Sequence, residues 1–124
     1  MKIYFAHSRH FLDYENDLYK PLRASALNAS HEIILPHEST AEAVTSKESI
    51  KTSDLVCAEV SYPATGVGIE LGWADAFGKP ILCLYKAGNE VSGSLQFLTK
   101  DFITYTDITD LISQLDEFLK KKVV

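Results

Sequence analysis

Short apolar runs alternate with longer segments of mixed polarity along the whole chain. Five of these runs are rich in aliphatic and β-branched side chains, which is typical of strands buried on both faces of a parallel sheet. The predicted strands comprise residues 2–6, 31–35, 54–60, 81–84 and 102–105. Between and after them, the sequence predicts helices at residues 11–29, 46–53, 67–77, 90–99 and 107–121.

The helix at residues 107–121 has the clearest pattern. Its apolar residues recur every three or four positions and form one stripe, comprising Ile108, Leu111, Ile112, Leu115, Phe118 and Leu119. The helix at residues 11–29 contains Pro21, which predicts a kink or a later start, because proline cannot donate the backbone hydrogen bond of a helix interior.

The alternation of strands and helices predicts an α/β fold, with residues 1–124 forming a single domain. Because strand–helix–strand crossovers are right-handed, the strands form a doubly wound parallel sheet. Five strands suggest a flavodoxin-like three-layer αβα sandwich with strand order 2-1-3-4-5. Ligands bind such sheets where the winding direction reverses, here between the first and third strands. This order brings the loops at residues 7–9 and 61–70 to one crevice.

Composition narrows the classes of function. The net charge of −5, with no basic patch besides Lys120, Lys121 and Lys122, disfavours a nucleic acid polymer as partner. A small phosphorylated ligand remains compatible, since helix N-termini bind phosphate without a basic surface. Cys57 and Cys83 fall in predicted buried strands, so we expect packed thiols rather than a disulfide or a metal site.

Two further expectations come from what the sequence lacks. No His or Cys cluster has the spacing of metal ligands, so we expect no metal and no cofactor. No signal peptide and no apolar run long enough to span a bilayer are visible, so we expect a cytoplasmic protein that does not bind membranes.

A strand–loop–helix–strand unit at residues 54–84 carries the most informative pattern. Glu70 falls in the first turn of its predicted helix, with Gly66, Gly68 and Gly72 around it. The spacing G-x-G-x-x-x-G differs from the dinucleotide motif G-x-G-x-x-G and follows a middle strand, which argues against a nicotinamide cofactor. Glu70 has two interpretations: a residue favoured by the helix dipole, or a catalytic carboxylate that free N–H groups and the dipole keep ionised.

The sequence AEVSYPATGVGIELGWADAFGKPILCL closely resembles the nucleoside 2-deoxyribosyltransferase superfamily, most of all its branch of 2′-deoxynucleoside 5′-phosphate N-hydrolases. The resemblance is dense over residues 53–84 and weaker around the first strand, His37 and Ser94. It implies that Glu70 is the nucleophile that attacks C1′ of the sugar and expels the base.

The resemblance also implies roles for residues outside this unit. Tyr4 matches a tyrosine close to the sugar and the nucleophile, although a core aromatic is an equal alternative. Ser8 matches a serine that holds the 5′-phosphate, and the Arg9 guanidinium is a further phosphate ligand by its chemistry. His37 matches a histidine near the base, with a surface histidine as the alternative. His7 departs from the glycine often found before that serine; a histidine there could touch the ligand, but a solvent-exposed loop histidine is the favoured interpretation.

The chain departs from the family pattern at two positions. Ser46 stands where the hydrolases carry an aspartate, and a serine cannot supply a proton at neutral pH. Glu42, Glu48 or Asp54 could substitute in a different local register; otherwise the protein would be slow, altered in substrate or inactive. Ala64 replaces a serine that touches the phosphate, and Thr65 could take over its hydrogen bond. The backbone at Gly66 and Gly68 would allow close approach of the ligand.

The resemblance further implies a homodimer or a higher homo-oligomer. Ser94 matches a serine that reaches the phosphate of the neighbouring subunit, with Ser92 or a helix-capping role as alternatives. The transferases bind the nucleoside 5′-hydroxyl with a C-terminal asparagine and carboxylate, and the chain ends without an obvious equivalent. We therefore expect cleavage of the N-glycosidic bond of a (deoxy)nucleoside 5′-monophosphate. The alternatives are base exchange by a transferase, and nucleotide binding by a catalytically impaired module.

Overall fold

Five parallel strands form one sheet in the computed structural model, which describes residues 1–11, 13–38 and 46–122. The order is β2-β1-β3-β4-β5, so the predicted α/β fold and strand order are confirmed. The strands are β1 (Lys2–His7), β2 (Glu32–Ile34), β3 (Leu55–Glu59), β4 (Ile81–Lys86) and β5 (Phe102–Tyr105).

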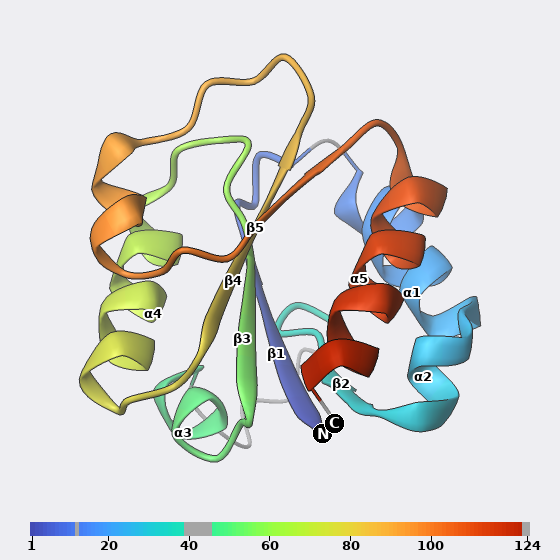
Figure 1. The fold of residues 1–124 in the computed structure, drawn as a ribbon, viewed down its shortest axis with the longest axis horizontal. Helices are drawn as coiled ribbons and strands as arrows, with labels where there is room; N and C mark the ends of the chain where they lie inside the picture. Colours follow the sequence, from blue (N-terminus) through green and yellow to red (C-terminus); the bar gives the residue numbers. More distant parts are fainter. Residues whose placement is uncertain (12, 39–45, 123–124) are drawn as a thin grey trace.

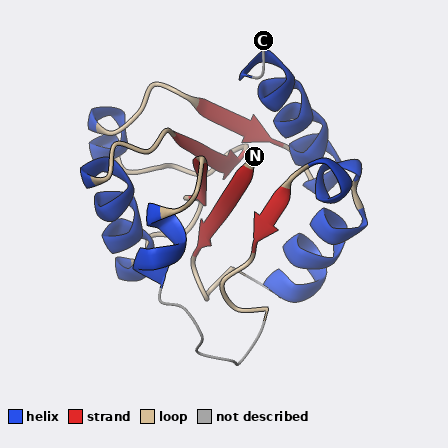
Figure 2. Cartoon of the chain, turned by 90° about the horizontal axis from the view of Figure 1, so that it is seen from below, coloured by secondary structure: helices blue, strands red, loops and turns tan. Residues whose placement is uncertain are grey.

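Helices cover both faces of the sheet (Figures 1 and 2). One layer contains α1 (Lys20–Ala24), α2 (Ala26–Ser30) and α5 (Ile108–Lys122). The other contains α3 (Ser46–Lys51), α4 (Thr65–Ala76) and the 3-10 turn η2 (Gly93–Phe97). Each layer encloses its own apolar cluster against the sheet. None of the described helices is both long and apolar enough to cross a membrane.

Alternation along β1 sends successive side chains to opposite layers. Ile3 and Phe5 pack in the cluster under α5, whereas Tyr4 and Ala6 pack in the cluster under α4. All four are at most 1% exposed, as expected for a strand in the middle of a doubly wound sheet. Tyr4 therefore reaches the layer that contains α4, and this places it beside Glu70.

The predicted helix at residues 11–29 is in fact three short pieces. A π-helical turn η1 (Glu15–Tyr19) leads into α1, and Pro21 lies in the first turn of α1, where its missing N–H is tolerated. Ser25 then adopts an extended conformation and separates α1 from α2. Pro21 thus follows the change from π-helical to α-helical turns, and the break in this helix comes at Ser25.

Two other boundaries differ from the predictions. Ala64 is extended and helix α4 begins at Thr65, so Glu70 lies in the second helical turn and not in the first. The predicted helix at residues 90–99 is only the 3-10 turn η2, whose N–H of Ser94 donates to the Ser92 hydroxyl at 3.3 Å. Cys57 and Cys83 are buried free thiols in opposite apolar clusters, and burial raises the pKa of Cys83 to about 11.

Candidate active site

A cleft of about 630 Å³ opens at the carboxyl-terminal edge of the sheet, between the ends of β1 and β3 and the start of α4. This is the point at which the winding of the sheet reverses, as the strand order predicts. The described residues around the cleft include His7, Ser8, Arg9, His10, His37, Ser46, Pro63, Ala64, Thr65, Gly66, Ile69, Glu70 and Trp73.

Glu70 is held in this cleft by two hydroxyl groups. The Tyr4 hydroxyl, from the middle of β1, donates a hydrogen bond to Glu70 Oε2. The hydroxyl of Ser46, the first residue of α3, also hydrogen bonds to the Glu70 carboxylate. Three elements that are distant in sequence thus converge on one carboxylate. Among the described residues around the cleft, Glu70 is the sole carboxylate.

Burial and hydrogen bonding act on Glu70 in opposite directions. Burial raises the pKa of the Glu70 carboxyl, while the hydrogen bonds from Tyr4 and Ser46 lower it. The pKa of Tyr4 lies far above its usual range because of burial and the Glu70 charge, so the phenol keeps its proton and donates a hydrogen bond to the carboxylate. The expectation that helix N–H groups keep Glu70 ionised is wrong, because Glu70 lies beyond the first turn and the side-chain hydroxyls provide the stabilising donors.

One end of the cleft has the features of an anion site. The first intrahelical bond of α4 runs from the Gly68 N–H to the Ala64 carbonyl at 3.2 Å, so the preceding N–H groups lack helical partners. Thr65 and Gly66 line the cleft at this helix start, opposite the exposed Arg9. Ala64 contributes no side-chain cap, and Thr65, the first residue of α4, lines the cleft beside it.

Ser8 orders the loop across from this helix start. Its side chain is almost fully buried, and its Oγ accepts a hydrogen bond from the His10 N–H at 3.0 Å. Its carbonyl accepts from the Phe11 N–H at 3.1 Å. Ser8 therefore lines the cleft and also closes the turn that carries Arg9.

A buried acid anchors the loop before α4. Glu59 accepts hydrogen bonds from the Ser61 N–H at 2.6 Å, from the Ser61 hydroxyl at 3.0 Å and from the Tyr105 hydroxyl. The Ser61 hydroxyl oxygen in turn accepts from the Lys86 N–H at 2.8 Å. Burial raises the pKa of Glu59. These bonds join the ends of β3, β4 and β5 beneath the loop that carries Ala64 and Thr65.

His7 and His37 lie close together at the edge of the cleft. Their ring centroids are 5.3 Å apart, and His7 is only 4% exposed, so the expectation of a solvent-exposed loop histidine is wrong. His7 is the last residue of β1 and points into an aromatic cluster with Tyr14 and Tyr19. Burial lowers the pKa of both histidines, so both are largely neutral at pH 7.

Some predicted site residues lie outside the cleft. Ser94 and Gly68 line a separate apolar hollow of about 350 Å³ between α4 and η2. Gly72 is exposed, and a Cβ added at Gly66, Gly68 or Gly72 would meet no atom within 4 Å. Packing within the described chain therefore requires none of these three glycines.

The suggested substitutes for the family aspartate do not replace it in the described cleft. Asp54 accepts a hydrogen bond from the Lys2 N–H at 2.7 Å, at the opposite edge of the sheet. Glu48 is exposed on α3 and is not among the described cleft residues. Glu42 lies outside the described residues.

Sequence reasoning missed one prominent wall of the cleft. Trp73 lies one helical turn after Glu70 on the same side of α4, and the Lys47 ammonium lies 5.9 Å from its ring centroid. The spacing of three residues from Glu70 was a signal that could have found it. Tyr19, behind the cleft, had no signal in the sequence because its contacts come from three separate segments.

Comparisons with known proteins show the family of the chain and match its fold. The family model for nucleoside 2-deoxyribosyltransferase matches residues 3–107, so the chain belongs to the nucleoside 2-deoxyribosyltransferase family. The mouse protein named 5-hydroxymethyl-dUMP N-hydrolase is 57% identical over 37 residues, which are 30% of this chain and 21% of the mouse protein. A Thermofilum pendens protein with the provisional name 2′-deoxynucleoside 5′-phosphate N-hydrolase 1 is 33% identical over 79 residues, covering 60% of this chain and 55% of that protein.

The matched segments thus span between about a fifth and about half of these relatives. A solved structure, the Clostridium botulinum CMP N-glycosidase BcmB, superposes with a TM-score of 0.71 at 21% identity. It covers 95% of this chain and 99% of the bacterial chain, and it confirms the fold.

Proposed function

We propose that this protein cleaves the N-glycosidic bond of a (deoxy)nucleoside 5′-monophosphate, with Glu70 as the nucleophile. The observation that carries the proposal is the Glu70 carboxylate, which hydroxyl donors hold in a cleft that also contains the start of α4. A carboxylate at one end and free N–H groups at the other suit a sugar phosphate. The names of the relatives, N-hydrolases and an N-glycosidase of nucleotides, support the same reaction class.

The reaction proceeds in two displacements at C1′. A Glu70 oxygen forms a bond to C1′ while the C1′–N bond breaks, and the electron pair leaves with the base. Water then attacks C1′ and loses a proton while the ester bond between C1′ and the Glu70 oxygen breaks. The sugar phosphate leaves and the Glu70 carboxylate is regenerated, as in retaining glycosidases. A second base in place of water would give transfer.

The leaving base must gain its proton or depart as an anion. Tyr4 keeps its proton because its pKa is raised, and Ser46 is a hydroxyl rather than a carboxylic acid. Neither of these described contacts of Glu70 is a general acid at neutral pH. The first step is therefore complete either when water protonates the leaving base or when the base is stable as an anion.

Base release from a panel of nucleoside 5′-monophosphates and free nucleosides, followed by chromatography, tests the proposal. We expect release from at least one monophosphate. If a new nucleoside forms when a second free base is added, the chain is a transferase. If nucleotides bind and no base is released, the chain is a binding module, and the loss would be traced to Ser46 by testing Ser46→Asp.

Changing Arg9 to Gln is expected to weaken phosphate binding selectively. A charge-assisted hydrogen bond to phosphate contributes about 1.5–3 kcal/mol, so KM for the monophosphate should rise about tenfold or more. The KM for the corresponding free nucleoside should stay within about twofold, since that substrate carries no charge for Arg9 to bind. Thr65→Val should act in the same direction. Lys100→Gln, at an exposed position outside the described cleft, is the charge control. An equal rise for both substrates would argue against a phosphate role.

We further propose that the protein forms a homodimer through the outer face of α4. Ile69 on α4 is 49% exposed and Phe97 in η2 is 84% exposed. Ile69 lies on α4, at the rim of the cleft, and Phe97 lies on η2; α4 and η2 are the two elements that line the apolar hollow containing Ser94. The resemblance assigns Ser94 to the phosphate of the neighbouring subunit, a role that needs this face to lie at an interface.

Phe97→Asp is expected to convert the dimer to a monomer, because it would bury a charge in the interface. Light scattering coupled to size exclusion measures the mass, and Phe102→Asp, at a less exposed apolar position on β5, is the control. Monomeric Phe97→Asp protein should also lose affinity for monophosphates. A monomeric wild-type protein would contradict the proposal.

A further inference from the structure

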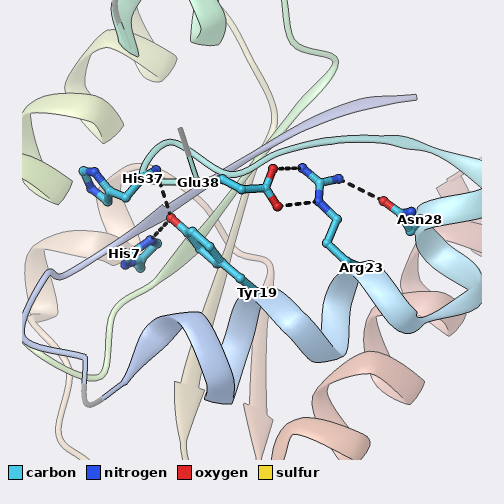
Figure 3. Close-up of polar contacts among 6 residues, drawn as sticks. All are labelled: His7, Tyr19, Arg23, Asn28, His37 and Glu38. Atoms are coloured by element: carbon cyan, nitrogen blue, oxygen red, sulfur yellow. Dashed lines mark hydrogen bonds and ion pairs between the residues drawn. The ribbon is translucent and has the colours of Figure 1, made fainter. Parts of the chain in front are cut away.

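Tyr19 belongs to a cluster of four rings with His7, Tyr14 and His37 behind the cleft. Figure 3 shows its hydroxyl between His7 and His37. Its ring centroid is 5.2 Å from that of His7 and 5.1 Å from that of Tyr14. The Tyr14 ring also lies 5.9 Å from the ring of His37. His7 and His37 line the cleft, whereas Tyr19 is not among the described cleft residues and is 4% exposed. Tyr19 thus contacts both histidines from outside the cleft.

The hydrogen bonds of this cluster have one consistent direction. His7 Nδ1 lies 3.0 Å from the Ser8 carbonyl oxygen, which only accepts, so Nδ1 carries the proton. In the neutral ring Nε2 is then an acceptor, and it lies 2.6 Å from the Tyr19 hydroxyl, which donates to it. The Tyr19 oxygen accepts from the backbone N–H of His37 at 3.1 Å.

This chain is satisfied only while His7 is neutral and Tyr19 is protonated. Burial lowers the pKa of His7 and raises the pKa of Tyr19, in keeping with both states. One hydroxyl group therefore sets the separation between the end of β1, where Ser8 follows His7, and the segment at His37.

A second side chain holds the same segment from the next helical turn. Arg23, four residues after Tyr19, donates from Nε to Glu38 Oε2 at 2.9 Å and from Nη2 to Glu38 Oε1 at 2.7 Å. Its Nη1 donates to Asn28 Oδ1 at 2.9 Å. The residues at positions 37 and 38 are thus held by Tyr19 and Arg23, and Figure 3 shows the His37 ring directed away from Arg23, toward α4.

We infer that Tyr19 is a positioning residue for the cleft: its hydroxyl holds His37 on one wall and the His7–Ser8 turn on the other. The catalytic consequence rests on the proposed function, because His37 and Ser8 matter to turnover only if they contact the substrate. The structural part of the inference, that the Tyr19 hydroxyl links His7 Nε2 to the backbone N–H of His37, stands independently of any activity.

Tyr19→Phe keeps the ring and removes both hydrogen bonds. Because the lost hydrogen bonds are between neutral groups and place residues that bind the substrate before reaction, we expect KM for the best monophosphate to rise about tenfold. The kcat should stay within about threefold of the wild-type value. Tyr14→Phe is the matched control, because its ring belongs to the same cluster and no hydrogen bond of its hydroxyl is seen among the described residues. It should leave both constants unchanged within about twofold.

A double-mutant cycle separates positioning from general destabilisation. If Tyr19 acts through His37, then Tyr19→Phe should cost less than about twofold in a His37→Ala background, because coupled residues are not additive. Additive effects would overturn this part of the inference. Should Tyr19→Phe fail to fold, Arg23→Gln loosens the same segment from the surface and should raise KM about threefold, with Lys20→Gln as its control.

The ligand-free readout is nitrogen NMR of the His7 imidazole. Wild type should show the Nδ1–H tautomer of His7 with a hydrogen-bonded Nε2. In Tyr19→Phe the tautomer should persist, because the Ser8 carbonyl still accepts from Nδ1, but the Nε2 resonance should move toward that of a free acceptor nitrogen, whereas Tyr14→Phe should match wild type. An unchanged Nε2 resonance in Tyr19→Phe would overturn the inference even in an active enzyme. If wild type releases no base but the Nε2 shift is present in Tyr19→Phe, the proposed function is rejected and the placement by Tyr19 stands.

Discussion

Glu70→Ala is expected to lower base release from the best nucleoside 5′-monophosphate by at least about 10³-fold, the scale seen when a nucleophile is removed from an enzyme. The carboxylate is the only one among the described cleft residues, so no described neighbour replaces it. Without it the developing positive charge on the sugar loses its counter-charge and the glycosyl ester cannot form. Time courses of base release, followed by chromatography, measure the loss.

Two additions make this test specific for a nucleophile. Formate, a carboxylate small enough for the vacated space, should restore part of the release in Glu70→Ala. A slowly hydrolysed substrate should add the mass of a sugar phosphate to wild type and not to Glu70→Gln. Asp75→Asn, an exposed acid on the same helix, is the matched control and should retain full activity. Full activity of Glu70→Ala on every nucleotide would refute the assignment.

Tyr4→Phe is expected to have the second largest effect, a loss of about 10²-fold in kcat, comparable to the removal of one preorganised hydroxyl donor at a reacting centre. The Tyr4 hydroxyl donates directly to Glu70 and is buried on β1, so its donor is fixed before the substrate binds. KM should change much less than kcat falls, because the Tyr4 ring and the shape of the cleft remain.

The pH profile of Tyr4→Phe is an independent test of the Tyr4–Glu70 hydrogen bond, because the direction of its shift is predicted. The hydrogen bond from Tyr4 lowers the pKa of Glu70, so its removal raises that pKa further. A nucleophile must be ionised, hence the acidic limb of kcat/KM should move to higher pH in Tyr4→Phe. Ser46→Ala should move it in the same direction by less, because Ser46 makes the smaller contribution. Tyr85→Phe, outside the described cleft, should not move it. An unshifted limb in Tyr4→Phe would show that Glu70 is not the group titrating there.

Periodicity predicted the layers of this fold because each strand is short, apolar and buried on both faces. β5 was predicted with its observed bounds, and the start of β4 was also correct. The helix at residues 11–29 was predicted with a kink or a later start at Pro21 and is three pieces, with the break at Ser25, whose extended conformation no local signal in the sequence marks. The start of α4 was missed by two residues because Ala64 has no side chain that signals a cap.

Some site residues were likewise predictable from the strand order, and others were not. The strand order inferred from the sequence predicted that the loop after β1 and the loop before α4 share one crevice, since the crossovers of a parallel sheet have one hand, and the structure has the same order. His7 was expected at the surface, yet pairing of β1 with β3 extends to His7 opposite Glu59 and buries its ring. A difference of one residue in the length of a strand decided whether this histidine was solvated.

The family, the parallel sheet and the segment that carries Glu70 could all be predicted from the sequence, because they depend on local periodicity and on a motif contiguous in the chain. Which side chains meet could be learned only from the packed fold. It placed Tyr4 and Ser46 on Glu70, Tyr19 between His7 and His37, and Ser94 in a separate hollow. The physical reason is that each contact joins residues from different elements, and its distance depends on how whole layers pack against the sheet.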